Sequence, residues 1–172
     1  GSEMCIRDSR RIDPVTDAYL KEDSYLEMDT VQLRGVDRTT RSTSAVLDKG
    51  AKIVVRERIM TDGDEDAVTK FKVELNGEDC GADVVSRSVA RGNSHQAFYS
   101  VIEGNARCTG HSACDAILAD NGRVDAQPAL NAANVDAALI HEAAIGKIAG
   151  DQIMKLCSLG LTRDCLLYTS PS

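Results

Sequence analysis

Between Ser24 and Leu118 the chain alternates short β-prone runs with clusters of turn-forming residues. The runs predict strands at Tyr25–Leu33, Ala45–Leu47, Lys52–Ile59, Thr69–Leu75, Asp83–Val89, His95–Ile102 and Ala113–Leu118. Asp-Gly and Asn-Gly steps lie between several of them, and such steps supply the positive φ of tight turns. The pattern therefore predicts a mainly β chain.

Glycines recur in the predicted turns at positions 50, 63, 77, 92, 104 and 122, with gaps of 12 to 18 residues. A near-constant gap favours stacked rungs, in which each turn of a β-solenoid uses about two such units. Because no strict sequence repeat accompanies the spacing, a β-sandwich stays open as the alternative.

The composition of the sequence changes after Asn134, where alanines become frequent and β-branched residues become fewer. The run Val135–Ile140 is compatible with a last strand. From Ala149 to Leu159 the apolar residues follow a helical period, and Gly160 is a suitable stop. We expect a short C-terminal helical segment that covers the open end of the solenoid.

Both ends of the chain look foreign to the fold. Gly1-Ser2 is typical of a tag-cleavage scar, and Met4–Ser9 and Cys165–Ser172 resemble translated adapter sequence of the kind found in metagenomic genes. The expected organisation is a foreign tail at 1–9, a β core at 10–148, a helical segment at 149–164 and a second foreign tail at 165–172. The natural segment is interpreted as a fragment of a longer gene.

Composition narrows the functional classes. The 27 acidic residues outnumber the 20 basic ones, for a net charge of −7, which disfavours nucleic acid or an anionic membrane as a partner. No apolar run approaches the roughly 18 residues of a spanning helix and no export signal is evident, so a cytoplasmic location is expected. Aromatic residues make up 3% of the chain, so the core is expected to consist of Val, Ile, Leu and Ala.

The densest reactive cluster in the sequence runs from Cys108 through His111 to Cys114 and Asp115. A thiolate can bind iron or accept sulfur, and a nearby histidine can lower a thiol pKa. The alternative is that Cys114, flanked by alanines, is a buried core thiol. Without a secretion signal, the core cysteines are interpreted as reduced thiols.

His141-Glu142 forms a second cluster. Neighbouring residues on a strand face opposite ways, so at most one of the two points toward a shared site. The alternative is a histidine at the rim of the fold. His95 is interpreted as structural, and the acidic residues between Asp62 and Asp66 as a solvated turn, since no EF-hand spacing follows them.

Five segments together resemble one family in order and spacing. They are Ser86–Ser100 (SRSVARGNSHQAFYS), Gly110–Leu118 (GHSACDAIL), Arg123–Leu130 (RVDAQPAL), His141–Ile148 (HEAAIGKI) and Asp151–Leu161 (DQIMKLCSLGL). They are similar to the C-terminal core of the SufB/SufD family of iron–sulfur cluster assembly proteins. The resemblance extends from about Tyr25 to Thr162 and implies a right-handed parallel β-helix followed by a short helical region.

The resemblance also implies a function. SufB and SufD form a scaffold with the ATPase SufC, on which an iron–sulfur cluster is built and then delivered. Cys114 occupies the place of the SufB cysteine in a Cys-Asp motif, and His141 and Glu142 match a SufB His-Glu pair. These three residues are the expected cluster or sulfur ligands, with Cys108, His111 and Asp115 as weaker candidates. The expected SufC-docking residues are Gly150, Asp151, Gln152, Ile153 and Leu156.

The chain is accordingly expected to be a non-enzymatic scaffold that holds a transient iron–sulfur cluster. Its expected partners are a SufC-type ATPase and a SufB/SufD-type subunit or a second copy, joined near the C-terminal strands. Cys114 and His141 are expected one rung apart at that end, with a bulging loop around Gln127-Pro128. One alternative is a structural β-helix dimerisation module that binds no cluster. A β-helix carbohydrate enzyme is less favoured because aromatic residues are few.

Overall fold

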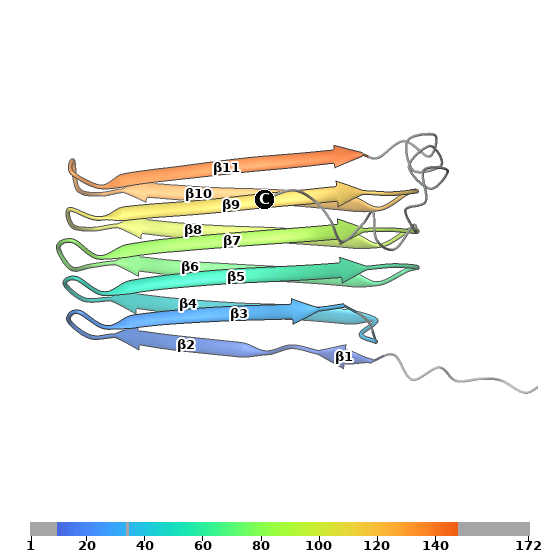
Figure 1. Ribbon diagram of the computed structural model, residues 1–172, viewed down its shortest axis with the longest axis horizontal. Helices are drawn as coiled ribbons and strands as arrows, with labels where there is room; N and C mark the ends of the chain where they lie inside the picture. Colours follow the sequence, from blue (N-terminus) through green and yellow to red (C-terminus); the bar gives the residue numbers. More distant parts are fainter. Residues whose placement is uncertain (1–9, 34, 148–172) are drawn as a thin grey trace, which may run out of the picture.

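The computed structural model describes residues 10–33 and 35–147, which form a parallel β-solenoid of about five turns (Figure 1). All eleven elements in these residues are strands. The mainly β prediction and the solenoid are therefore confirmed, and the sandwich alternative is wrong. The helical segment expected at 149–164 lies outside the described residues.

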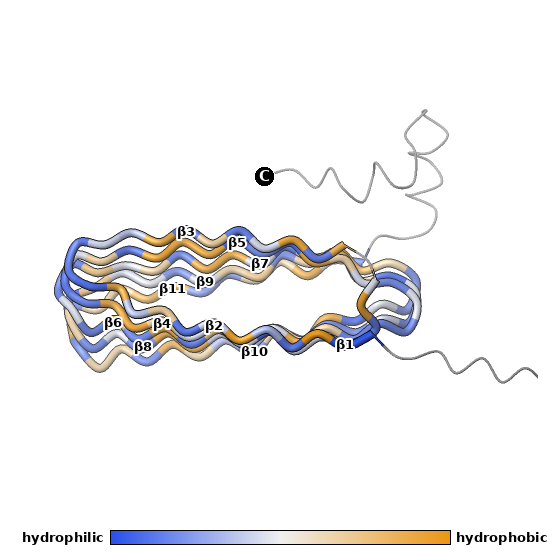
Figure 2. Tube along the Cα trace, turned by 90° about the horizontal axis from the view of Figure 1, so that it is seen from below, coloured by the Kyte–Doolittle hydropathy of each residue, from blue (hydrophilic) through white to orange (hydrophobic). Residues whose placement is uncertain are grey.

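The strands alternate between two sheets that face each other and are closed by turns at both sides (Figure 2). Sheet A contains β1 (Arg11–Ile12), β2 (Val15–Leu20), β4 (Arg38–Leu47), β6 (Asp66–Leu75), β8 (His95–Gly104) and β10 (Arg123–Ala132). Sheet B contains β3 (Tyr25–Gln32), β5 (Lys52–Thr61), β7 (Gly81–Ala90), β9 (Thr109–Leu118) and β11 (Ala138–Lys147).

Every strand pairs in parallel with its counterpart one turn away. Tyr25 pairs with Lys52, Lys52 with Gly81, and Gly81 with Thr109, so one rung uses 27 to 29 residues. Residues in register on successive strands lie about 4.8 Å apart, which stacks equivalent side chains into columns. β10 and β11 are the last strands of their sheets among the described residues.

The turn glycines are required for two different reasons. Gly50, Gly63 and Gly92 have φ values of 67°, 58° and 60°, a region that favours glycine. Gly77 has no positive φ, but a Cβ there would lie 1.9 Å from the backbone nitrogen of Lys49 in the rung below. Glycine at 77 is thus fixed by the close approach of two stacked turns.

Two local predictions were wrong. The run Ala45–Leu47 is only the end of the longer strand β4, whose first half is rich in Thr, Ser and Arg. No bulge occurs at Gln127-Pro128, because β10 continues through it and Pro128 pairs with Ser100 in unbroken register. Proline is tolerated there because β10 is the edge strand of sheet A among the described residues, and a backbone N–H is not required on its outer side.

The interior has two unlike halves, named here by the turns beside them. The apolar half lies beside the turns that lead from sheet A to sheet B and contains Leu47, Ile53, Val55, Leu75, Val84 and Ile102. The polar half lies beside the turns that lead from sheet B to sheet A and buries Thr39, Glu57, Thr61, Thr69, Ser86, Ser88, Ser94 and Gln96. The expectation of a core of Val, Ile, Leu and Ala thus holds in one half and is incomplete in the other, where Ile59, Ala67 and Ala90 are buried together with the polar residues.

Candidate functional site

Cys114 lies on β9 and faces the interior, where it is 1% exposed. It is in register with Ser86 in the rung below and with Ala143 in the rung above. Burial raises the pKa of its thiol to about 11, and the negative charges of Asp115 and Glu57 add to the effect. At neutral pH the buried Cys114 side chain is therefore a protonated, neutral thiol.

His141 lies on β11 and is in register with Ser112. Because Ala143 is in register with Cys114 and strand residues alternate, His141 faces the same interior as Cys114, two positions away along the strand. Its Nδ1 and Nε2 atoms are both buried and have no hydrogen-bond partner among the described residues. Buried polar atoms without a partner are costly, so this imidazole has a free binding position at the last described rung.

Glu142 faces the opposite way, with its side chain 70% exposed on the outer surface of sheet B. Its Oε2 lies 3.5 Å from Nε2 of His111, and Nδ1 of His111 lies 2.7 Å from Oδ1 of Asp83. The hydrogen bond with Asp83 is the main cause that raises the His111 pKa. Asp115 also faces outward, 3.7 Å from the guanidinium of Arg87.

The structure therefore divides the predicted site residues among three places. Cys114 and His141 share the interior, while His111, Asp115 and Glu142 lie on the outer face of sheet B. Cys108 is buried at the corner that precedes β9. The residues expected to dock SufC, at 150–153 and 156, lie outside the described part of the chain.

A buried carboxylate behind Cys114 was missed at the level of sequence. Glu57 is 1% exposed on β5, in register with Ser86 and hence in the column that leads to Cys114. Arg41 donates to its Oε1 at 2.9 Å, Thr69 donates to the same oxygen at 3.0 Å, and Ser86 donates to Oε2 at 3.0 Å. Burial still raises the Glu57 pKa, with Arg41 opposing it.

A cavity of about 10 Å³ adjoins this column. Thr69, Ser86, Gln96 and Cys114 contribute to its wall. This volume is about the minimum that holds one water molecule. Apolar residues, among them Ile59, Ala67 and Phe98, form most of the lining surface. Cys114 thus borders a small, mostly apolar space on its inner side that also contains hydroxyl and amide groups.

A family model for the SUF system FeS cluster assembly SufBD core domain matches residues 14–165 of the chain. The chain belongs to the SufBD family. The match includes both sheets, together with Cys114, His141 and Glu142. The family expectation from the sequence is confirmed.

Curated SufBD relatives cover shorter parts of the chain. An iron–sulfur cluster assembly SufBD family protein of Archaeoglobus fulgidus is 40% identical over 91 residues, which are 52% of this chain and 25% of that protein. A relative of the same description from Methanocaldococcus jannaschii is 37% identical over 93 residues, which are 54% of this chain and 29% of that protein. The SufBD chain thus spans about a quarter of the length of these relatives.

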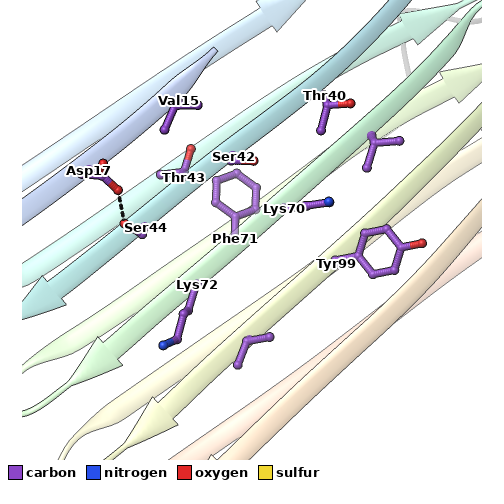
Figure 3. Close-up of a pocket in the computed structure, with 12 residues that line it drawn as sticks. Val15, Asp17, Thr40, Ser42, Thr43, Ser44, Lys70, Phe71, Lys72 and Tyr99 are labelled. Atoms are coloured by element: carbon purple, nitrogen blue, oxygen red, sulfur yellow. Dashed lines mark hydrogen bonds between the residues drawn. The ribbon is translucent and has the colours of Figure 1, made fainter. Parts of the chain in front are cut away.

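A large hollow of the SufBD chain is lined by neither Cys114 nor His141. It measures about 700 Å³ and lies on the outer face of sheet A, where Lys70, Lys72 and Tyr99 line it together with Val15 (Figure 3). It contains none of the site residues expected from the sequence. Within 10–33 and 35–147, no three His, Cys, Asp or Glu side chains are grouped to hold a metal ion, and no helix is long and apolar enough to cross a membrane.

Proposed function

We propose that the chain is a scaffold component of the SUF system on which an iron–sulfur cluster is built, with Cys114 and His141 as ligands to the cluster. The observation that carries the proposal concerns the two buried ring nitrogens of His141, which have no hydrogen-bond partner among the described residues and lie on the same interior face as the Cys114 thiol. Membership of a family of iron–sulfur cluster assembly proteins supports it. The cluster is the cargo of this scaffold.

The chemistry of the two ligands suits a cluster that must leave. Thiolate sulfur binds iron firmly, and imidazole nitrogen binds it less firmly. A mixed set of ligands therefore holds a cluster less tightly than four thiolates do. Cys114 is held as a thiol until iron replaces its proton, because burial raises its pKa. Glu142 joins this ligand set only where β11 twists, since its carboxylate faces the outer surface.

The proposal also includes the remaining ligands of the cluster and the proteins that bind this chain. β10 and β11 each leave one side of the backbone unpaired among the described residues, and such edges are templates for pairing with another strand. A second copy or a SufB/SufD-type subunit that pairs there brings further side chains to Cys114 and His141. A SufC-type ATPase docks through residues 150–153 and 156, and assembly takes place in the cytoplasm.

Anaerobic reconstitution with ferrous iron and sulfide tests the proposal. The chain is expected to gain iron and visible absorbance, and both are expected to fall at least several-fold in Cys114→Ser and in His141→Ala. His95→Gln is the matched control, because His95 lies on the outer face of sheet A. Equal iron content in the Cys114→Ser chain and the unaltered chain would show that Cys114 is not a ligand.

A structural dimerisation module without a cluster is the second candidate function, and the open edges of β10 and β11 favour it. The two functions are separated by measuring mass in solution beside iron content. A dimer that binds no iron under reconstitution supports the structural module. A dimer whose iron depends on Cys114 supports the scaffold.

A further inference from the structure

Two cysteines that play no part in the proposed cluster site are stacked at one corner of the solenoid. Cys80 ends the turn between β6 and β7, and Cys108 ends the turn between β8 and β9. Gly81 is in register with Thr109, so the residues just before them occupy equivalent positions on consecutive rungs. The backbone N–H of Thr109 donates to the carbonyl oxygen of Cys80 at 3.1 Å, which continues the ladder through this point.

The two thiols are near enough for each to change the pKa of the other. The side chain of Cys80 hydrogen-bonds to that of Cys108. Cys80 is 0% exposed and Cys108 is 4% exposed, so both sulfurs lie just inside the corner. The equivalent positions in the rungs below and above are Ala51 and Ala137, so the column holds these two sulfurs between two small apolar residues.

The backbone spacing at this corner suits a covalent link. Stacked residues lie about 4.8 Å apart, within the Cα separation of roughly 4.4–6.8 Å that disulfides span. Cys114 differs from this pair, because its neighbours in register are Ser86 and Ala143. Among the described cysteines, Cys80 and Cys108 are the two that the fold places side by side.

We propose that Cys80 and Cys108 form an oxidisable dithiol, which a peroxide converts into a disulfide that joins the two rungs. In the first step the Cys108 thiolate attacks hydrogen peroxide, so that an S–O bond forms and the O–O bond breaks, and the departing hydroxide takes up the proton that Cys108 released and leaves as water. In the second step the Cys80 sulfur attacks the sulfur of the resulting sulfenic acid, so that the S–S bond forms, the S–O bond breaks, and the hydroxyl leaves as a second water with the proton of the Cys80 thiol. Two thiols and one peroxide thus give one disulfide and two waters.

The order of the two steps follows from the surroundings of each sulfur. Cys108 is the more exposed of the pair, and the Cys80 thiol donates to it. This hydrogen bond opposes the rise in the Cys108 pKa that burial causes. Burial also raises the pKa of Cys80. Both thiols are therefore slow to react at neutral pH, and oxidation is expected to accelerate as the pH rises.

Peroxide treatment of the folded chain, followed by peptide mass spectrometry without reduction, tests the dithiol. The protein used carries Cys5→Ser, Cys157→Ser and Cys165→Ser, so that the thiols outside the described residues cannot compete. The expected product is a peptide pair joined through Cys80 and Cys108. The link closes a loop of one rung, so the midpoint of thermal unfolding is expected to rise by roughly 5–10 °C and to return after reduction.

Two matched variants complete the test. In Cys80→Ser the link is absent and Cys108 advances to sulfinic acid, because no sulfur remains to resolve the sulfenic acid. In Cys114→Ser the Cys80–Cys108 link forms as before. The proposal is wrong if Cys80 and Cys108, both unsubstituted, become sulfinic acids in the folded protein. It is also wrong if both stay reduced while Cys114 is oxidised. Neither outcome depends on iron binding, so the test is independent of the proposed scaffold function.

Discussion

The two halves of the solenoid interior are built from the same strands but by different means. In the apolar half, stacked Leu, Ile and Val side chains fill each rung, and Leu47, Leu75 and Ile102 are almost completely buried. In the polar half many of the stacked residues are Thr, Ser, Gln and Glu. Their polar atoms bond to one another, across the two sheets in Thr69–Glu57 and Gln96–Thr61 and between neighbouring strands of sheet B in Ser86–Glu57. One half is stabilised by removing apolar surface from water, and the other by satisfying polar groups that burial has deprived of water.

The difference bears on function because the polar column leads toward the last described rung. Glu57, Ser86 and Cys114 occupy one register position on three consecutive strands of sheet B. A uniformly apolar interior would isolate Cys114 from any other polar group. The polar half instead gives the thiol hydroxyl neighbours, and Thr69, Ser86 and Gln96 share the wall of a small cavity with it.

The largest expected effect is in the apolar half. Leu75→Ala removes a fully buried side chain from the middle of the stack and leaves a cavity that the strands on either side cannot close. We expect a loss of about 3 kcal/mol in the free energy of unfolding, measured by denaturant titration. Val46→Ala on the same sheet is the control, because that side chain faces outward. An equal loss in both variants would contradict the assignment of the core.

The polar half is expected to respond according to whether its charges remain paired. Arg41→Ala leaves the buried Glu57 without its cation and is expected to cost about 2–3 kcal/mol. Arg41→Met combined with Glu57→Leu removes both charges and is expected to recover most of that loss. Such recovery would indicate that the ion pair is not retained for stability, and iron binding by the double variant would then show whether it serves the site.

Several features of this comparison could be read from the sequence, and others could not. Positive φ at Gly50, Gly63 and Gly92 follows from local turn chemistry, and the opposite facing of His141 and Glu142 follows from strand alternation. Pro128 in a strand could not be predicted, because its tolerance depends on β10 being at an edge, which only the assembled sheet defines. Glu57 gave a usable signal, since Val55, Glu57 and Ile59 alternate with Arg56 and Arg58 and therefore face inward together.

The Cys114 thiol provides a pH test of the polar half. Its folded pKa of about 11 lies above the ordinary value, so folding favours the neutral thiol. Its contribution to stability is complete below about pH 8.5 and is lost as the pH rises toward 11. We expect a decline of about 2 kcal/mol across that window, measured by chemical denaturation under reducing conditions. In Cys114→Ala this part of the decline should vanish, and an unchanged decline would assign it to other groups.

The smallest expected effect is on the outer surface of sheet A, where the side chain of His95 links three consecutive strands and faces away from both halves of the interior. The Nδ1 and Nε2 atoms of His95 lie 2.8 Å from Asp66 Oδ1 and 2.9 Å from Asp125 Oδ2, and these two hydrogen bonds raise its pKa. A raised folded pKa means that the contribution is complete below the unfolded pKa of about 6.5 and is lost as the pH rises through the folded value.

We therefore expect the midpoint of thermal unfolding to fall slightly from pH 6 to pH 8, and to fall less in His95→Gln. The effect is kept small by solvent, because the carboxylates of Asp66 and Asp125 are substantially exposed. His111→Gln is the matched comparison on sheet B, where Asp83 raises the His111 pKa in the same direction. An equal or steeper fall in His95→Gln than in the unaltered chain would mean that folding does not raise the pKa of His95. The ion pairs of His95 with Asp66 and Asp125 would then not contribute to the stability of sheet A.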